Sequence, residues 1–299
     1  MRDRSALEDA ERIDLHTHTS WSDGTCTVAE LLARAAEAGL GTIAVTDHDT
    51  VGCWGEIPAA SAASGVSVVP GIEVSAEHQG LSVHVLALLV DPSPDTELAH
   101  EMARARRSRV ERAQRMVELI GRDHPIAWKD VRAQAADGDT VIGRPHIADA
   151  LVAHGVLPDR SAAFREILHP SGPYYVPYYA PSPATAVRAI REAGGVAIAA
   201  HPASGTRDAE VPASVLEDMI GAGLAGIEVD HREHDEPERR RLGEFARSQG
   251  LLVTGGSDYH GAGKPNRLGE NLTQPDVLAA IIRRATSSTE VIRPWTWST

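Results

Sequence analysis

The chain has 299 residues, with 29 Lys and Arg against 42 Asp and Glu, and a formal net charge of −13. This length suits one large domain or two ordinary ones, and two cysteines are too few for a disulfide framework. The acidic balance disfavours a protein that coats nucleic acid without regard to sequence. No apolar run of about 18 residues is present to span a membrane, and the N-terminal sequence lacks the apolar segment of a signal peptide. We therefore expect a cytoplasmic protein without a membrane partner.

Seven short apolar runs predict β-strands, at residues 12–16, 42–46, 66–70, 82–90, 196–200, 225–229 and 251–255. Most of these runs are almost continuously apolar, which is typical of parallel strands covered by helices. Helices are expected between them, at residues 27–39, 183–193, 212–222, 236–249 and 275–285. The first of these begins with the capping-box spacing of Thr27 and Glu30. Alternation of strand and helix predicts an α/β fold with a parallel sheet or barrel.

One segment interrupts this alternation. Residues 94–183 contain no convincing strand, and helices are expected there at 95–122, 128–137, 144–154 and 161–168. We predict a barrel formed by residues 12–93 and 184–290, with residues 94–183 inserted as a helical cap over one end of it.

Histidine and acidic residues gather where the predicted strands end. The first strand leads into His16 and His18, which point to the same side because they are two residues apart. Asp23 follows in the next turn, and His48 lies between two aspartates after the second strand. The later strands carry further residues of this kind: Glu73, His84, His201, Glu228, Asp258 and His260. Catalytic groups of α/β barrels lie at the carboxyl ends of the strands, and 14 His with only 2 Cys favour metals bound through nitrogen and oxygen.

Six motifs occur in an order that resembles the PHP (polymerase and histidinol phosphatase) superfamily. They are HTHTSWSDG, VTDHD, GIEVS, SVHVL, AAHP and GGSDYHG, and they span about residues 12–270. The resemblance implies a distorted, TIM-like (β/α)7 barrel with two or three divalent metal ions, which could be Mn, Fe or Zn. The insertion lies where the stand-alone phosphoesterase branch of the superfamily has one.

The resemblance also implies three sets of metal ligands. The first ion is expected at His16, His18, Glu73 and Asp258. The second is expected at Glu73, His84 and His201, and the third at Asp23, His48 and His260. A hydroxide bridging two ions, held by Glu73, Asp258 and His201, would then attack phosphorus directly, without a covalent enzyme intermediate. Asp47, Asp49 or a metal-bound water could transfer the proton, and the sequence does not choose among them.

Substrate-binding residues are expected in the insertion. A helix is predicted to begin at Gly143-Arg144-Pro145-His146, and its N-terminus could bind phosphate. Similar phosphoesterases have an RPH motif here that faces the substrate phosphate, so the resemblance implies this role for Arg144 and His146. Arg207, Lys264 and Arg267 are further candidates. The tyrosines within residues 174–179 could stack on a nucleobase or serve as an aromatic linker. The Arg-rich segment 104–115 is interpreted as a solvated helix face.

The branch that this sequence resembles implies hydrolysis at nucleotide ends. The expected reaction is that of a 3′,5′-nucleoside bisphosphate phosphatase, a 5′–3′ exonuclease of short RNA or DNA, or both. The expected partners are a phosphorylated small molecule, a nucleotide or a short single-stranded nucleic acid end, with no obligate protein partner. Alternatives are a histidinol-phosphate-type phosphatase, a non-catalytic metal-binding regulatory domain, and a metal-dependent amidohydrolase that the SDG and SDYHG motifs fit poorly.

Overall fold

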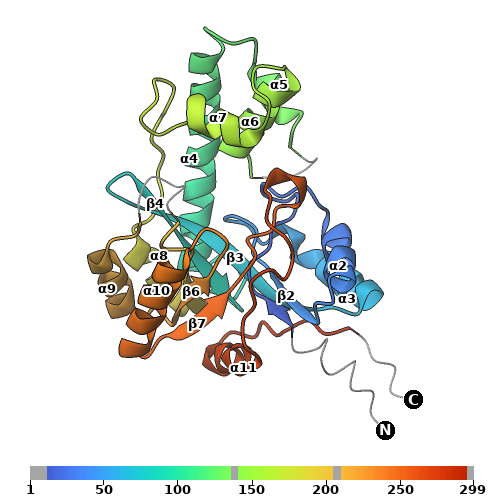
Figure 1. Ribbon diagram of the computed structural model, residues 1–299, viewed down its shortest axis with the longest axis vertical. Helices are drawn as coiled ribbons and strands as arrows, with labels where there is room; N and C mark the ends of the chain where they lie inside the picture. Colours follow the sequence, from blue (N-terminus) through green and yellow to red (C-terminus); the bar gives the residue numbers. More distant parts are fainter. Residues whose placement is uncertain (1–11, 136–140, 205–209, 295–299) are drawn as a thin grey trace.

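A seven-stranded sheet forms the centre of the computed structural model, which describes residues 12–135, 141–204 and 210–294 (Figure 1). Its strands are β1 (Ile13–Asp14), β2 (Thr42–Val45), β3 (Ser67–His78), β4 (Leu81–Leu88), β5 (Val196–Ala200), β6 (Gly226–Asp230) and β7 (Leu252–Gly255). They are hydrogen-bonded in chain order from β1 to β7. Beyond the two outer strands, Thr17 pairs with Tyr259 in parallel, and the amide of His18 donates to the carbonyl of Tyr259 at 2.9 Å. The sheet is therefore a nearly closed barrel, and the predicted α/β barrel is confirmed.

The expectation of a parallel sheet is wrong for β4, which runs antiparallel to both β3 and β5. Strand β3 continues to His78, eight residues past its predicted end, and turns back through Gln79 and Gly80, whose φ angles are 52° and 87°. A two-residue turn with positive φ at both positions matches the twist of an antiparallel hairpin. The reversal places His84, in the first half of β4, opposite Ala200 at the carboxyl end of β5.

Helices cover the outside of the barrel (Figure 1). They are α2 (Val28–Glu37), α3 (Ile57–Ser64), α8 (Pro183–Glu192), α9 (Ala213–Ala222), α10 (Glu236–Ser248) and α11 (Pro275–Arg284). The capping box of Thr27 and Glu30 is present at the start of α2. Helix α3 was not predicted, and its eight residues include four alanines and three serines or prolines with little amphipathic pattern. No helix in the described part of the chain is long and apolar enough to cross a membrane.

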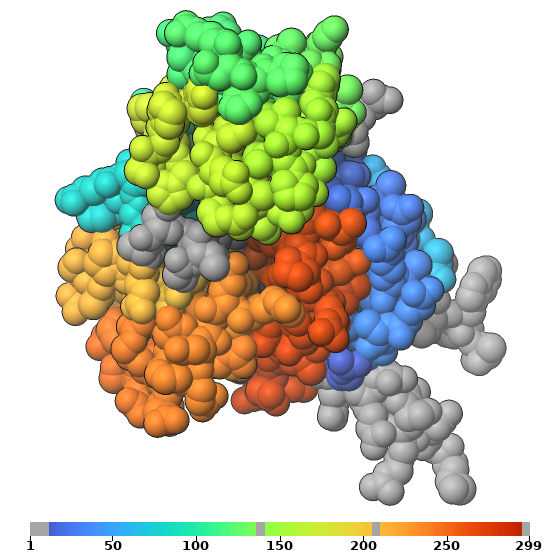
Figure 2. Space-filling view, turned by 45° about the horizontal axis from the view of Figure 1, so that its top comes forward, coloured from blue at the N-terminus to red at the C-terminus, as the bar shows by residue number. Residues whose placement is uncertain are grey.

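The segment between β4 and α8 is helical and stands above one face of the barrel (Figures 1 and 2). It contains α4 (Glu97–Ile120), α5 (Trp128–Arg132), α6 (Arg144–Ala153) and α7 (Arg160–Glu166). These helices share a buried apolar cluster that includes Met116, Ile120, Val131, Ile147 and Leu151. The insertion therefore has a hydrophobic core that is separate from the clusters of the barrel.

Candidate metal centre

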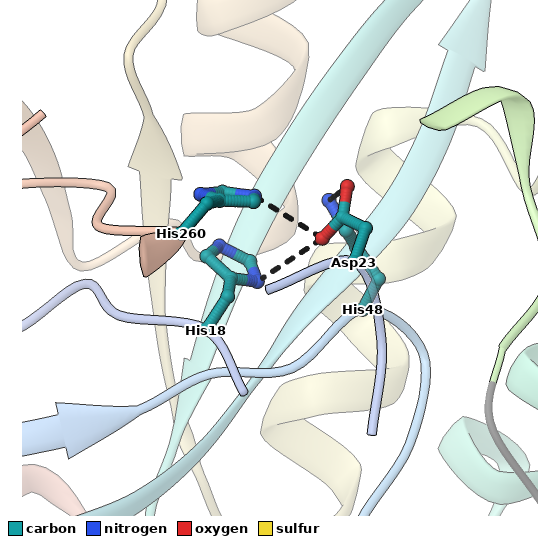
Figure 3. A group of neighbouring side chains, drawn as sticks. All are labelled: His18, Asp23, His48 and His260. Carbon is teal, nitrogen blue, oxygen red and sulfur yellow. Dashed lines mark ion pairs between the residues drawn. The ribbon is translucent and has the colours of Figure 1, made fainter. Parts of the chain in front are cut away.

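Three histidines from distant parts of the chain surround the carboxylate of Asp23 (Figure 3). His18 follows β1, His48 follows β2 and His260 follows β7, so closure of the barrel brings them together. The Nε2 atom of His260 lies 3.1 Å from Oδ1 of Asp23. The Nε2 atom of His48 lies 3.8 Å from Oδ2, and Nδ1 of His18 lies 3.9 Å from Oδ1. One donor atom from each of the four residues lies within 4.8 Å of the others.

A second group of donor atoms lies deeper, between His16, His18, Glu73 and Asp258. Oε2 of Glu73 is 3.3 Å from Nε2 of His16 and 3.1 Å from Nε2 of His18. Oδ1 of Asp258 is 3.3 Å from Nε2 of His18. These four residues are the set expected for the first ion.

The other oxygen of Glu73 contacts two histidines, which form a third group with it. Oε1 of Glu73 is 2.6 Å from Nδ1 of His84 and 2.9 Å from Nε2 of His201. His48 also approaches this carboxylate, with Nδ1 3.3 Å from Oε2. All nine predicted ligands thus lie in one cluster with Glu73 at its centre. Their assignment to individual ions stays a prediction, since His18 and His48 each reach two groups.

The cluster suits divalent cations because its donor atoms are buried and unsatisfied. Within the described residues, no hydrogen-bond partner is present for Nε2 of His16, either ring nitrogen of His18, Nδ1 of His48, Oε2 of Glu73 or Nε2 of His260. A buried polar atom without a partner costs about 1–3 kcal/mol. Nitrogen and oxygen atoms packed this closely would be satisfied together by shared ions.

Charge within the cluster shifts the pKa of its members. Burial alone would raise the pKa of Asp23, Glu73 and Asp258, but neighbouring histidines, and Lys264 beside Asp258, hold all three well below the usual range. The carboxylates are therefore ionised and ready to bind cations.

The histidines respond in opposite directions. Burial lowers the pKa of His18, but the nearby carboxylates of Asp258 and Glu73 more than offset this effect and raise the pKa to about 9. Burial, together with the positive charge of Lys264, lowers the pKa of His260 to about 4. A cation that binds at His18 must therefore displace a proton, whereas His260 already offers a neutral ring.

Backbone strain also concentrates at this centre. His201 and Asp258 have φ angles of 29° and 51°, and Asp49, next to His48, has a φ of 51°. A non-glycine residue in the left-handed region costs about 1–3 kcal/mol and is common where function fixes a side chain. Both residues contribute side chains to the cluster, where His201 contacts Glu73 and Asp258 contacts His18.

Residues behind the cluster hold the histidines in place. Oε1 of Glu228 lies 3.1 Å from Nδ1 of His16, and its Oε2 accepts a hydrogen bond of 2.8 Å from the amide of His201. The sequence located Glu228 at a strand end but gave it no role, although an acid within the apolar run GIEVD is an available signal. His231, which sequence reasoning missed, is fully buried with Nε2 3.6 Å from Oδ2 of Asp258.

The aspartates that flank His48 have structural contacts. Asp47 accepts hydrogen bonds from the amide and hydroxyl of Thr19 and from the hydroxyl of Ser22. Asp49 accepts from the amide of Ser75 and pairs with Arg109 at 3.0 Å. Both carboxylates therefore hold loops around the centre, which argues against either as the proton-transfer group.

A cleft of about 860 Å³ lies beside the cluster, between the barrel and the insertion. Its walls include Gly24, next to Asp23, and His146, Arg160 and Lys264. The ammonium of Lys264 lies 2.6 Å from Oδ2 of Asp258. Of the predicted substrate residues, the structure places His146 and Lys264 on this cleft.

The other substrate candidates lie elsewhere. Arg144 begins α6 but does not line the cleft, and its guanidinium donates to the carbonyl of Leu168 at 3.3 Å. Arg267 is exposed, and Arg207 lies outside the described residues. The aromatic segment packs along α4, where the amide of Tyr179 donates to the hydroxyl of Ser108 at 2.8 Å.

The interpretation of residues 104–115 as a solvated helix face is wrong in part. The side chain of Arg109 is only 12% exposed and Arg112 is 6% exposed. Both guanidinium groups lie over the ring of Tyr178, at 5.7 Å and 4.3 Å from its centroid. Their partners are distant in sequence, so the helical pattern alone could not show that this face is covered.

Taken together, a seven-stranded barrel with clustered histidines and carboxylates at its mouth defines a metal-dependent hydrolase. Residues 14–128 match the model of the PHP domain. The chain is 32% identical to the 3′,5′-nucleoside bisphosphate phosphatase of Chromobacterium violaceum, over 94% of this chain and 98% of that protein. It is 29% identical to the 5′–3′ exoribonuclease of Haemophilus influenzae, over 91% and 98% of the two chains.

A solved structure gives the same result. A protein from Bifidobacterium adolescentis, described as a metal-dependent phosphoesterase, superposes with a TM-score of 0.90 at 43% identity, over 93% of this chain and 98% of that one. The chain belongs to the PHP family of metal-dependent phosphoesterases.

Proposed function

We propose that this protein hydrolyses phosphate monoesters or diesters at nucleotide ends, as a 3′,5′-nucleoside bisphosphate phosphatase, a 5′–3′ exonuclease of short single strands, or both. The observation that carries the proposal is the cluster of nine ligand-type side chains centred on Glu73, beside a cleft whose walls include Lys264 and Arg160. The names of the relatives in C. violaceum and H. influenzae support the substrate class.

The nine residues would hold two or three ions of Mn, Fe or Zn. Bound ions of this kind lower the pKa of water and neutralise the charge of a phosphoryl group. Glu73, Asp258 and His201 lie at the centre of the cluster, where they would position the attacking water against phosphorus. Glu228 fixes the ring of His16 and the backbone of His201, so that both present Nε2 to the centre.

Residues of the cleft would orient the phosphate. Lys264 lies 2.6 Å from Asp258 and carries a positive charge to the edge of the centre. His146 and Arg160 come from α6 and α7 on the opposite wall. Arg160 is held by Asp149 and donates to the carbonyl of Asp23 at 3.1 Å, which joins the insertion to the metal-binding loop.

We propose that residues 94–183 act as a cap on the barrel. The cleft beneath α6 and α7 is bounded by both parts of the chain. A covered cleft of this kind would admit a nucleotide or a single-strand end more readily than a duplex. The cytoplasmic location expected from the sequence stays a prediction.

The experiment is a substrate comparison with protein loaded with manganese. Adenosine 3′,5′-bisphosphate, a short 5′-phosphorylated RNA and histidinol phosphate would each be offered at the same concentration. We expect turnover of the first, the second or both. Turnover of histidinol phosphate alone would refute the nucleotide assignment, and no turnover at full metal occupancy would favour a non-catalytic domain.

A further inference from the structure

A buried histidine outside the nine predicted ligands lies against the metal centre. His231 directly follows β6 and is fully buried. Its Nδ1 accepts a hydrogen bond of 3.2 Å from the amide of Glu233, so the neutral ring carries its proton on Nε2. Across residues 12–135, 141–204 and 210–294, this Nε2 has no hydrogen-bond partner. A buried donor without an acceptor is unfavourable, so this N–H favours any acceptor that comes within reach.

One oxygen of Asp258 is such an acceptor. Its Oδ2 lies 3.6 Å from Nε2 of His231, slightly farther than a hydrogen bond allows. The other oxygen, Oδ1, lies 3.3 Å from Nε2 of His18 and 3.5 Å from Nε2 of His16. The two oxygens of this carboxylate therefore have different neighbours. Oδ1 is next to predicted ligands of the first ion, and Oδ2 is next to His231.

The ring of His231 has a fixed position. Its centroid lies 5.2 Å from that of His201 and 5.3 Å from that of His234. Arg239, on α10, donates to the carbonyl of His231 at 2.8 Å. The ring of His234 is held in turn, because its Nδ1 donates to the carbonyl of Val229 at 2.9 Å. A fully buried ring with these contacts keeps its N–H in one place beside the centre.

Lys264 contacts the same oxygen of Asp258 but has more freedom. Its ammonium lies 2.6 Å from Oδ2, and its side chain is 26% exposed on the wall of the cleft. A lysine has a flexible four-carbon stem, so it can turn towards an anion that enters the cleft. His231 cannot follow the anion, and it stays beside Oδ2 whether or not Lys264 moves.

We propose that His231 is a positioning residue, whose Nε2–H donates to Oδ2 of Asp258 in the metal-bound protein and so presents Oδ1 alone to the cations. The proposal rests on the proposed function, because it requires that the cluster binds metal, and it adds the atom through which Asp258 binds. Groups that hydrogen-bond to metal ligands commonly fix their orientation. A single ligand oxygen from Asp258 also leaves a coordination position for the attacking water.

The test compares two variants of His231. His231→Phe keeps an aromatic ring but removes the N–H, whereas the NH₂ group of His231→Gln can replace it. His100→Phe makes the first change at an exposed histidine and is the control. Chelator-treated protein is titrated with Co²⁺, with calorimetry for affinity and visible absorption for ligand geometry. His231→Phe should weaken binding by about 10- to 100-fold and change the spectrum, and His231→Gln should stay within about threefold of the wild type with the same spectrum.

Three results would overturn the proposal. The first is wild-type affinity and spectrum in His231→Phe. The second is equal loss in His231→Phe and His231→Gln, because ring packing and not the N–H would then fix Asp258. The third comes from kinetics at saturating manganese, where kcat of His231→Phe should fall by about tenfold or more while KM changes less than about threefold. A change in KM alone would contradict a positioning role.

A measurement on the unchanged chain covers the case in which His231→Phe does not fold. Side-chain ¹⁵N NMR of the histidines reports the tautomer of each ring, and the signals of His231 are identified by their loss in His231→Gln. We expect the proton on Nε2, with its resonance moving downfield when Zn²⁺ binds, because a shorter hydrogen bond deshields the proton. A proton on Nδ1, or a resonance that Zn²⁺ leaves unchanged, would refute the role of His231.

Failure of this role and failure of the proposed function are distinguishable, because metal binding is measured without substrate. If the wild type cleaves no nucleotide substrate but Co²⁺ binding responds to His231→Phe as expected, the nucleotide assignment fails and the role of His231 stands. If the wild type cleaves a nucleotide substrate and His231→Phe binds Co²⁺ as the wild type does, the role of His231 fails and the proposed function stands.

Discussion

Glu228→Gln tests whether the residues behind the cluster control metal binding. One oxygen of Glu228 accepts from the amide of His201 at 2.8 Å, and the other lies 3.1 Å from Nδ1 of His16. The amide of His201 can only donate, so the single oxygen of the introduced glutamine must stay with it. Nδ1 of His16 lies 3.3 Å from that oxygen and 3.1 Å from the other. The NH₂ group of the glutamine would take the closer of the two positions, and Nδ1 of His16 would have to become the acceptor. The proton of the ring moves to Nε2, the atom that faces Glu73 and Asp258.

The expected loss follows from this change of tautomer. A hydrogen bond to a charged group contributes about 1.5–3 kcal/mol, so metal binding should weaken by about 10- to 150-fold. The same range is typical when residues that orient metal ligands are changed. Activity should return at high metal concentration because the ligand atoms themselves are intact.

The assay titrates metal into chelator-treated protein and follows both hydrolysis and the melting temperature. Asp230→Asn serves as the control, because it makes the same acid-to-amide change at the half-exposed end of the same strand. If Glu228→Gln binds metal with wild-type affinity, the proposed orientation of His16 is wrong.

Three further predictions concern the centre itself. Asp258→Asn and His201→Ala should each lower kcat by about 100-fold or more while the circular dichroism spectrum stays native, and wild-type rates in either variant would contradict the ligand assignment. A chelator should lower the melting temperature, since metal at 100 times its Kd adds about 2.7 kcal/mol, or about 5–10 °C for a chain of this size; an unchanged melting temperature would argue against a bound metal. Metal affinity should rise with pH between 7 and 9, because the pKa of His18 lies at about 9 and its ring must lose a proton before it can bind. Calorimetry in two buffers of different ionisation enthalpy measures this proton release, and equal observed heats of binding in the two buffers would refute it.

The sequence alone predicts those parts of the fold and of the metal centre that depend on local residue patterns. The apolar runs located all seven strands, and the members of the cluster follow these strands in loops, except Glu73 and His84, which lie within β3 and β4. The direction of β4 was missed because a continuous apolar run indicates burial on both faces and not the direction of the strand. The direction of β4 follows instead from the turn before it, because positive φ at both Gln79 and Gly80 favours a tight hairpin and therefore an antiparallel strand.

The missed residues depend on contacts between distant segments. Arg109 and Arg112 follow helical spacing that also suits a solvated face, and only the fold brings Asp49 and Tyr178 against them. Glu228 differs from a surface acid only through its contacts with His16 and His201, which come from two other parts of the chain. Long-range pairing of this kind leaves no periodic pattern in one sequence.

The shared carboxylate of Glu73 limits how the centre can diverge. Its Oε2 contacts His16, His18 and His48, and its Oε1 contacts His84 and His201, so one side chain belongs to every neighbouring group except that of Asp23. A substitution at Glu73 would disturb several ligands together, whereas Asp23, which is 14% exposed, could change with less effect on the interior. Descendants of this protein could therefore lose or exchange the outer site while they keep the inner one, but they could not alter the inner groups one at a time.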